Sequence, residues 1–441
     1  MRSTATRATH SSSRALLLVL PWLLLSLSIV SRAGAENWPG WRGPRGDGSS
    51  SESNLPRTWD GERGTHVRWK AELPGRGHAS PVVWEDSVFV VSCREETRER
   101  ILVCLDRDSG ATRWERPVFS GPLETLHALN SHASGTPATD GRRIYVAFQV
   151  VDGRTIPAPN VGTPRPVTPG EMMVAAFDMQ GQPVWTARPG PFISAHGFAT
   201  CPVLYEDLVI VNGDHDGDSF LAALHRDTGQ VVWKVEREHK TRSYCTPLVR
   251  RIDGRDQLVL SGNRCIASYA PRTGERLWYI DGPTEQFVAS MVYDGRLFFM
   301  TCGYPDYHVL GIDPRGTGDV TRSHVAWRST AAHCYVPSPV VVGNYLMIAD
   351  DRGTGHCFET ARGEHLWKGR LSGGFNHSPV HADGLAYFAA DDGVTKVVRP
   401  GATPEIVAEN RLGEALHASP ALSQGCIFLR GERHLYCIQA P

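Results

Sequence analysis

The sequence predicts an all-β fold, an eight-bladed β-propeller of four-stranded antiparallel blades that is closed by the N-terminal strand. Three observations support this prediction. A tryptophan-ended phrase recurs along the chain, eight short openings precede strand-like segments, and the last repeat lacks a strand that the N-terminus can supply. Recurrence at a spacing of roughly 30–50 residues indicates one repeated supersecondary unit, and four short strands per unit indicate a propeller.

The first observation concerns the tryptophans. Six phrases end in Trp, and in five of them a Gly stands four residues before it, whereas the sixth contains a longer turn. These residues are Trp114, Trp185, Trp233, Trp278, Trp367 and, after the longer turn, Trp327. A buried indole needs a partner for its N–H, and Gly allows a left-handed turn and leaves room for the ring. We therefore interpret these tryptophans, together with Trp69, as structural docking residues.

The second observation is the opening of each repeat, a small residue that is usually followed by Pro. The openings are Ser80-Pro81, Thr136-Pro137, Cys201-Pro202, Thr246-Pro247, Ser290-Met291, Ser338-Pro339, Ser378-Pro379 and Ser419-Pro420. Each precedes a turn pair and then a run rich in β-branched and aromatic residues, which is typical of antiparallel strands. A third strand leads into the turn of the docking phrase, and the Trp lies on the fourth.

The third observation explains the two ends of the chain. The eighth repeat stops at Pro441 after its third strand, whereas Val67–Ala71 reads as a fourth strand with its own Trp69 and no repeat before it. Pairing these two segments closes the ring and hides two strand edges that would otherwise promote aggregation. The seventh repeat carries no Trp, so seven blades is the alternative if one repeat is misread.

The N-terminal region predicts export. Residues 1–35 combine a basic start, an apolar run over Ala15–Val30 and the small-residue site Ala33-Gly34-Ala35, which is the pattern of a signal peptide cleaved after Ala35. Residues 36–66 are an N-terminal extension, and residues 67–441 are the propeller. We expect a secreted or periplasmic protein with no membrane span and no lipid anchor. The chain carries 46 basic and 47 acidic residues without a long basic run, which argues against nucleic-acid binding.

Ten cysteines in an exported chain permit disulfides. If the last hairpin turns at Gly431-Glu432, Cys426 and Cys437 face each other, and the same construction pairs Cys93 with Cys104. Directly opposed strand cysteines make strained bridges, so the alternative is that these residues are buried apolar thiols.

Loops of a four-stranded meander alternate between two faces. The tight turns between strands one and two and between strands three and four share one face, which we call the turn face. The long, variable segments Val151–Glu171, Pro117–Ser134 and Gly303–Tyr307 fall on the other, which we call the loop face. Loops on a rigid scaffold carry function more often than the scaffold does, so we predict the binding site on the loop face.

The docking phrase, small-x-Asp-x-x-Thr-Gly-x-x-x-Trp, resembles the tryptophan-docking motif of quinoprotein propellers. Over about residues 67–441 the chain resembles the PQQ-like (pyrroloquinoline quinone-like) β-propeller repeat family, which includes quinoprotein alcohol dehydrogenases and outer-membrane assembly lipoproteins of the BamB type. The opening NWPGWRGPRGDG is also similar to the start of exported PQQ-like repeat proteins. The resemblance implies the fold and leaves the cofactor open, because the motif builds blades rather than a quinone site.

Two groups of residues are candidates for binding. The motif NGDHDGDS places Asp214, Asp216 and Asp218 at alternate positions of a loop, which predicts a Ca²⁺ site or, alternatively, a solvated acidic turn. The second group precedes the first strand of each blade at the mouth of the central channel, where convergent polar side chains form a ligand pocket or solvate the walls. Its members are His78, His132, His196, Arg242, Tyr244, Tyr335, Asn376, His377 and His417. Arg242 and Lys240 are candidates for binding an anionic group.

These residues predict a ligand-binding or protein-interaction module on the loop face rather than an enzyme. The partners are other exported proteins or a small ligand; a carbohydrate or peptide is one interpretation. The alternative is a quinoprotein oxidoreductase, for which the resemblance implies PQQ, Ca²⁺, a catalytic Asp and often a vicinal disulfide. The sequence has no adjacent Cys pair and no haem-attachment motif, so PQQ and Ca²⁺ lack support from individual residues, and no catalytic residue is predicted.

Overall fold

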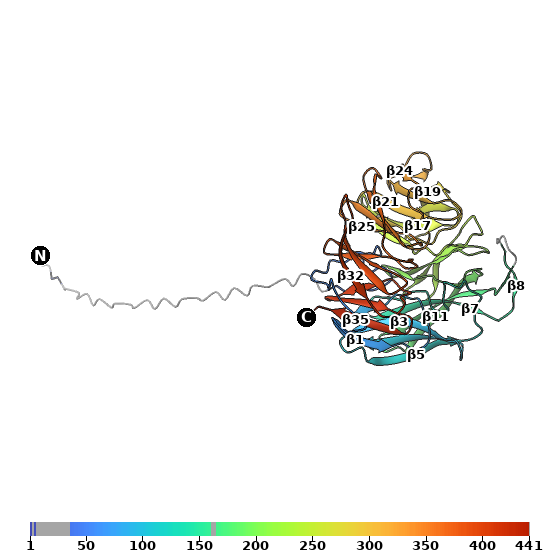
Figure 1. Cartoon of the computed structure of the whole chain (residues 1–441), viewed down its shortest axis with the longest axis horizontal. Coiled ribbons are helices and arrows are strands. Elements are labelled where there is room, and N and C mark those ends of the chain that lie inside the picture. The colour runs from blue at the N-terminus through green and yellow to red at the C-terminus, as the bar shows by residue number, and fades with distance from the viewer. Residues whose placement is uncertain (2–3, 6–35, 160–164, 441) are drawn as a thin grey trace. The chain divides into compact units, whose positions relative to one another are not determined.

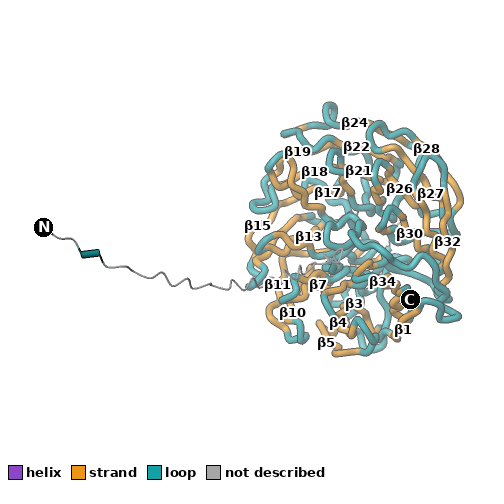
Figure 2. The backbone as a smooth tube through the Cα atoms, turned by 90° about the vertical axis from the view of Figure 1, so that its left-hand side faces the viewer, coloured by secondary structure: helices purple, strands orange, loops and turns teal. Residues whose placement is uncertain are grey.

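The computed structural model describes residues 1, 4–5, 36–159 and 165–440. The predicted signal peptide therefore lies almost entirely outside the described residues. Residues 36–159 and 165–440 belong to one compact unit. The described residues of this unit build eight blades, each with four antiparallel strands, that succeed one another around a ring, as the order of the outer strands β15, β19, β24, β28 and β32 shows in Figure 2. This confirms the predicted eight-bladed propeller.

The first four blades follow the chain in order. Blade 1 contains β2 (Val82–Trp84), β3 (Ser87–Arg94), β4 (Glu99–Asp106) and β5 (Thr112–Ser120). Blade 2 contains β6 (Ala138–Thr139), β7 (Arg143–Val151), β10 (Gly170–Asp178) and β11 (Pro183–Phe192), with the hairpin β8 (Ile156–Pro157) and β9 (Pro166–Val167) inserted before β10. Blade 3 contains β12 (Val203–Tyr205), β13 (Leu208–Gly213), β14 (Phe220–His225) and β15 (Val231–Glu236). Blade 4 contains β16 (Leu248–Ile252), β17 (Arg255–Gly262), β18 (Cys265–Tyr269) and β19 (Arg276–Asp281).

The last four blades complete the ring, which Figure 1 shows from the side. Blade 5 contains β20 (Val292–Tyr293), β21 (Phe298–Cys302), β22 (His308–Ile312) and β24 (Val325–Ser329). Blade 6 contains β25 (Val340–Val342), β26 (Tyr345–Ala349), β27 (Thr354–Glu359) and β28 (His365–Arg370). Blade 7 contains β29 (Val380–Ala382), β30 (Leu385–Ala389), β31 (Val394–Arg399) and β32 (Glu405–Arg411). Blade 8 contains β33 (Ala421–Ser423), β34 (Cys426–Arg430), β35 (His434–Gln439) and β1 (Val67–Glu72).

The position of a strand in its blade explains its sequence. The second strands are mostly buried, and β13 (LVIVNG) is buried along its whole length, because neighbouring blades cover both faces of the sheet. The outer strands alternate instead, and β15 (VVWKVE) buries Trp233 while its flanking residues are exposed. The core therefore lies between the blades.

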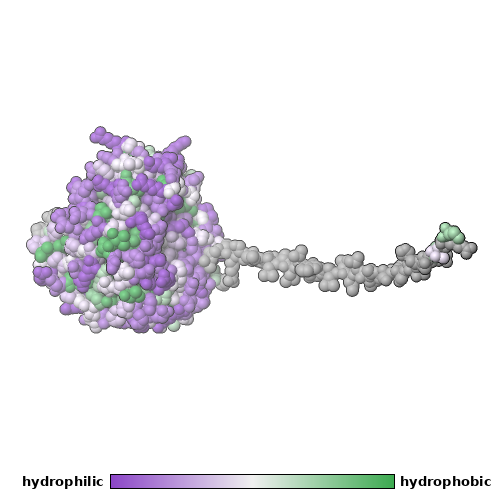
Figure 3. Space-filling model, turned by 180° about the vertical axis from the view of Figure 1, so that it is seen from behind, coloured by the Kyte–Doolittle hydropathy of each residue, from purple (hydrophilic) through white to green (hydrophobic). Residues whose placement is uncertain are grey.

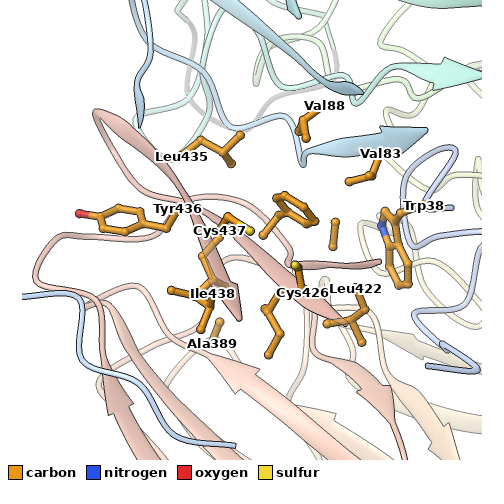
Figure 4. Close-up of a cluster of buried hydrophobic side chains, with 14 of the residues drawn as sticks. Trp38, Val83, Val88, Ala389, Leu422, Cys426, Leu435, Tyr436, Cys437 and Ile438 are labelled. Carbon is orange, nitrogen blue, oxygen red and sulfur yellow. The ribbon is translucent and has the colours of Figure 1, made fainter. Parts of the chain in front are cut away.

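The ring closes as predicted, because β1 pairs antiparallel with β35, with Trp69 opposite Cys437. A buried guanidinium joins this blade to blade 1: Arg430 donates hydrogen bonds to the carbonyls of Ala79 and Val91, both at 2.9 Å. Burial lowers the pKa of Arg430 to about 9. Figure 4 shows the apolar cluster at this seam, in which side chains from both ends of the chain pack together.

Docking tryptophans join one blade to the next at six of the eight blade boundaries in the described ring. Six indoles donate to a backbone carbonyl in the turn of the following blade: Trp69 to Arg107, Trp114 to Met179, Trp185 to Arg226, Trp233 to Pro271, Trp327 to Thr360 and Trp367 to Gly401. The turn Gly makes room for the Trp of the preceding blade, since a Cβ on Gly181 would lie 2.9 Å from the Trp114 ring. Such a phrase therefore contains a Trp that docks on the next blade and a turn that accommodates the Trp of the preceding blade.

Trp278 differs from the other six. Its indole donates to Gln257 Oε1 in its own blade at 2.8 Å. The turn that should receive it belongs to the longer sixth phrase, and there β23 (Gly318–Asp319) instead pairs in parallel with β19. The irregular spacing before Trp327 thus reflects an added edge strand on blade 4.

The cysteine registers differ from the prediction. Cys426 lies opposite Gln439 and Cys437 opposite Phe428, because Arg430 pairs with Leu435 across the hairpin turn and the register is shifted by two residues from the prediction. In blade 1, Cys93 lies opposite Arg100 and Cys104 opposite Phe89. Neither predicted pair is directly opposed, and all four of these cysteines are buried free thiols.

Residues 36–52, which we call the N-terminal strap, cross the turn face. Their contacts reach six blades through Val83, Thr139, Arg250, Ser338, His381 and Gly425. Trp38 and Arg42 are both almost fully buried. The guanidinium of Arg42 donates to the carbonyls of Ser338 and Asp47, and burial lowers its pKa to about 10. Within the part of the chain that is described, no helix is long and apolar enough to cross a membrane.

Candidate functional site

A cavity of about 1070 Å³ opens on the loop face of the propeller. Eight of the nine predicted channel residues line it: His78, His132, His196, Tyr244, Tyr335, Asn376, His377 and His417. The ninth, Arg242, is turned toward Asp216 and forms an ion pair of 2.5 Å with it. The links that enter the blades therefore converge on one cavity.

The deeper wall of the cavity is a ring of small polar residues, the same ones that open the repeats. The N–H of one opening donates to the hydroxyl of the next around much of the ring: Ser80 to Thr136, Thr246 to Ser290, Ser290 to Ser338, Ser338 to Ser378 and Ser378 to Ser419, at 2.8–2.9 Å. Thr136 donates similarly to Cys201 Sγ at 3.3 Å. The recurring Ser or Thr is explained by this acceptor role.

The strap contributes Trp41 to the lining of the same cavity. Because the strap crosses the turn face, this indole lies at the end of the cavity away from the loop face. The next residue, Arg42, helps to hold Trp41 in place, because its guanidinium donates a hydrogen bond to the carbonyl of Ser338, a residue of the hydroxyl ring. This role of the strap was not predicted from the sequence. The signal was present in the Trp- and Gly-rich opening NWPGWRGPRGDG, but nothing local indicated where the opening docks.

Seven histidines line the cavity: His78, His127, His132, His196, His333, His377 and His417. His78 stacks on His417 with ring centroids 4.6 Å apart, and burial together with that neighbour lowers the pKa of His78 to about 3. Burial and the charge of Arg242 likewise lower the pKa of His196 to about 3. These two imidazoles are neutral at neutral pH, so each can both donate and accept a hydrogen bond.

The cavity's carboxylates serve largely to fix the links. Asp351 accepts hydrogen bonds from the N–H groups of Tyr335 and Val336 at 2.7 and 2.8 Å, and Asp391 accepts two from Asn376. Burial raises the pKa of Asp351. In blade 3, Asp216 receives the N–H of Ala195 in the same way. A repeated signal, the Asp after the second strand in IADDRG and AADDGV, could have revealed this anchor.

The predicted calcium loop binds cations of the protein's own chain. Asp214 pairs with Arg237 at 2.6 Å, Asp216 with Arg242, and Asp218 with Lys240 at 2.6 Å. Across residues 36–159 and 165–440, no group of three or more His, Cys, Asp or Glu is arranged to hold a metal ion. The three carboxylates thus point to three separate partners instead of converging. The same pairs engage Lys240 and Arg242, the residues predicted to bind an external anion.

A second cavity, of about 860 Å³, adjoins the first on the loop side of blades 4 and 5. Tyr307 and His333 line both cavities and stack on each other with ring centroids 4.6 Å apart. Its lining contains both basic residues, Arg264 and Arg328, and acidic residues, Asp281, Glu285 and Asp306. The stacked pair forms the partition between the two spaces.

The lining of the larger cavity does not match PQQ. That quinone carries three carboxylates, whereas the cavity lining has the acids Glu95, Asp351, Asp391 and Glu432 against the cations Arg76 and Arg352. Arg76 is already paired with Glu432 at 3.0 Å. A tricarboxylate would meet a wall with an excess of negative charge.

Comparisons with known proteins agree with the fold. The family model described as outer membrane protein assembly factor BamB matches residues 57–156, 98–293 and 305–399. The protein of that name from Legionella pneumophila (strain Paris) is 25% identical over 204 residues, which are 44% of this chain and 49% of the relative. The match thus spans about half the length of that relative.

Among solved structures, BamB from Moraxella catarrhalis superposes with a TM-score of 0.57 at 13% identity, covering 84% of this chain and 99% of that one. A europium-containing methanol dehydrogenase gives a TM-score of 0.60 at 12% identity, covering 91% of each chain. A quinohemoprotein alcohol dehydrogenase from Comamonas testosteroni gives 0.54 at 11% identity, covering 93% of this chain and 82% of that one. At these identities the structures show a shared fold alone. The repeats, the docking tryptophans and the matched residues together show that this chain belongs to the PQQ-like β-propeller repeat family of the outer membrane protein assembly factor BamB.

Proposed function

We propose that this protein is an exported binding module whose site is the loop-face cavity, and that its ligand is a small, neutral, hydroxyl-rich molecule such as a saccharide. The observation that carries the proposal is the convergence of eight predicted channel residues on one cavity. A cavity of about 1070 Å³ is at the upper end of the size range of small-molecule sites.

The charge of the lining favours a neutral ligand. The carboxylates Asp351 and Asp391 are already hydrogen-bonded to the links, and no arginine of the lining is buried. An anion would face a lining with an excess of acidic over basic side chains. A ligand hydroxyl, by contrast, both donates and accepts, and so do neutral imidazoles and the Ser and Thr hydroxyls of the lining.

The aromatic residues supply flat apolar surfaces for the same class of ligand. Trp41 lies at the end near the turn face, while Tyr244 and Tyr335 lie on the walls. The Tyr244 hydroxyl is fixed by Ser194 at 2.9 Å and that of Tyr335 is hydrogen-bonded to Gln286 at 3.1 Å. Rigid rings that need no ordering on binding keep the entropic cost low.

Thermal shift and calorimetry with a defined panel test the ligand class. The panel holds glucose, maltotriose, cellotetraose and chitotriose as neutral saccharides, with PQQ and citrate as anions. At a concentration of 100 Kd the bound form gains about 2.7 kcal/mol, which is a shift of roughly 3 °C for a chain of this size. We expect a neutral saccharide to raise the Tm of the wild type and of His225→Ala, a control on the turn face, but not of His78→Ala.

Binding of the anions alone would overturn the ligand class, and a shift that survives His78→Ala would place the site elsewhere. If no member of the panel binds, the small-ligand proposal fails and the scaffold interpretation is preferred.

The family description also favours a second candidate function. The relative is named an outer membrane protein assembly factor, and by analogy this chain would be a scaffold that binds a protein partner. Leu129, which is 57% exposed at the cavity mouth, would lie at such an interface. On the side seen in Figure 3, hydrophobic residues form only small patches among hydrophilic ones. A photo-crosslinker at Leu129, but not one at the outer-strand residue Val184, should then yield one discrete adduct in the exporting cell.

A further inference from the structure

We propose that Glu36 becomes the first residue of the processed protein and that its α-ammonium is held by the buried carboxylate of Glu52. The nitrogen of Glu36 lies 2.6 Å from Glu52 Oε1. The same carboxylate accepts hydrogen bonds from the N–H groups of Gln424 at 2.6 Å and Gly425 at 2.9 Å. Glu52 is only 6% exposed.

Glu52 lacks a cationic partner among the described residues. Each group that contacts its carboxylate is a backbone N–H, and none of the ion pairs in residues 36–159 and 165–440 includes it. A buried carboxylate is costly unless it is paired with a positive charge. Conversion of the Glu36 amide into a free ammonium places such a charge at 2.6 Å, and a charge-assisted hydrogen bond is about twice as strong as a neutral one.

The remainder of Glu36 is fixed in a way that suits a terminal residue. Its carboxylate binds Arg45 through two nitrogens at 2.6 and 2.8 Å, and its carbonyl accepts the hydroxyl of Ser423 at 2.5 Å. The neighbouring acid Asp47 is paired with Arg250. Since the carboxylates of Glu36 and Asp47 are already paired with arginines, Glu52 is the carboxylate left for the ammonium.

The sequence independently predicts cleavage at this position, between Ala35 and Glu36. Processing would then have a structural effect beyond release of the chain. Gln424 and Gly425 form the turn of blade 8, the blade that β1 closes, and the strap that begins at Glu36 carries Trp41 into the cavity. The new terminus therefore fastens the strap to blade 8 and supports the deep end of the cavity.

The test uses the full-length chain exported and processed by its host. Intact-mass analysis gives the mature terminus, and limited acylation at neutral pH with an N-hydroxysuccinimide ester then measures the reactivity of its α-amine relative to the exposed Lys368. We expect a terminus at Glu36 whose acylation is about tenfold slower than in Glu52→Gln, since an amine held in an ion pair reacts only after local opening. Glu62→Gln, which changes an exposed acid of the same extension, should leave the rate unchanged.

A second variant keeps the proposal testable if Glu52→Gln does not fold. One Ala inserted after Ala35 yields a mature chain whose ammonium is displaced by one residue, about 3.8 Å, with Glu52 intact. We expect faster acylation and a lower Tm for this chain. A mature terminus elsewhere, or equal acylation rates in wild type and the inserted variant, would overturn the proposal. No ligand enters the experiment, so its outcome is independent of the proposed function.

Discussion

The buried ion pair of blade 3 gives the sharpest prediction. Arg237 and Asp214 have side chains that are 1% and 0% exposed, and Arg237 binds both carboxylate oxygens, at 2.6 and 3.2 Å. Replacement of Arg237 by Met preserves much of the apolar stem but leaves Asp214 with Ser243 as its side-chain partner, at 2.8 Å. Removal of one partner of such a pair costs about 3–5 kcal/mol, because the remaining charge is buried without compensation.

The assay is unfolding in denaturant and by heat, with Arg237→Met compared with the double variant Arg237→Met plus Asp214→Asn. For a propeller of this size the loss corresponds to about 4–6 °C in Tm. The double variant should recover most of it, since it removes the stranded charge as well. If the single and double variants are equally unstable, packing rather than charge accounts for the loss and the reasoning is refuted.

The pH dependence of the single variant provides an independent check. Burial already raises the pKa of Asp214 in the wild type, and without Arg237 this effect is unopposed. An acid with a raised pKa in the folded state binds more protons folded than unfolded, so stability increases as the pH falls through that range. We expect Arg237→Met to regain stability as the pH is lowered from neutral toward the ordinary pKa range of a free Asp, unlike the double variant.

The fold and the site lead to three more predictions. Calcium should not raise the Tm of the wild type, because Arg237, Arg242 and Lys240 are paired with the three carboxylates of the loop. A calcium-dependent rise in Tm that is abolished by Asp214→Ala plus Asp216→Ala would instead support a calcium site. Gly181→Ala should lower the free energy of unfolding by about 2–5 kcal/mol, since its Cβ would meet Trp114 at a positive φ. Gly384→Ala, which also has a positive φ but open space around it, should lower it by about 1–2 kcal/mol. Equal losses for the two variants in denaturant titrations would contradict the docking role. His78 is held neutral with a pKa of about 3, so stability should fall as the pH drops below about 6.5, and His78→Asn should show a flatter acid limb in pH-dependent unfolding.

The channel residues illustrate how much of the site a sequence can reveal. His78, His377 and His417 precede the first strands of different blades, and the repeat places all such positions around one axis. Periodicity therefore predicted their convergence without any contact information. The same logic would have revealed the anchoring role of Asp351 and Asp391, whose motif also repeats.

The calcium loop shows where local reasoning stops. Asp214 and Asp216 have the spacing of a cation site, and they do bind cations, but these are Arg237 and Arg242 of a link more than 20 residues away. The cysteine pairs depended in a similar way on the position of a turn, because a longer turn than predicted shifted the register of β35 against β34.

The sequence by itself indicated eight blades with seven as the alternative, and it predicted the closing strand, the positions of the link residues and the docking role of six of the seven tryptophans. Each of these follows from short-range patterns repeated around the ring. Only the tertiary structure decided what the non-repeated parts do. Arg42 is hydrogen-bonded to Ser338, which is 296 residues away in the sequence, and the carboxylate of Glu52 accepts hydrogen bonds from both Glu36 and Gly425. No local propensity encodes such contacts. The strap, the ion pairs and the deep end of the cavity arise from such long-range packing, since their energies depend on distances that exist only once the ring is closed.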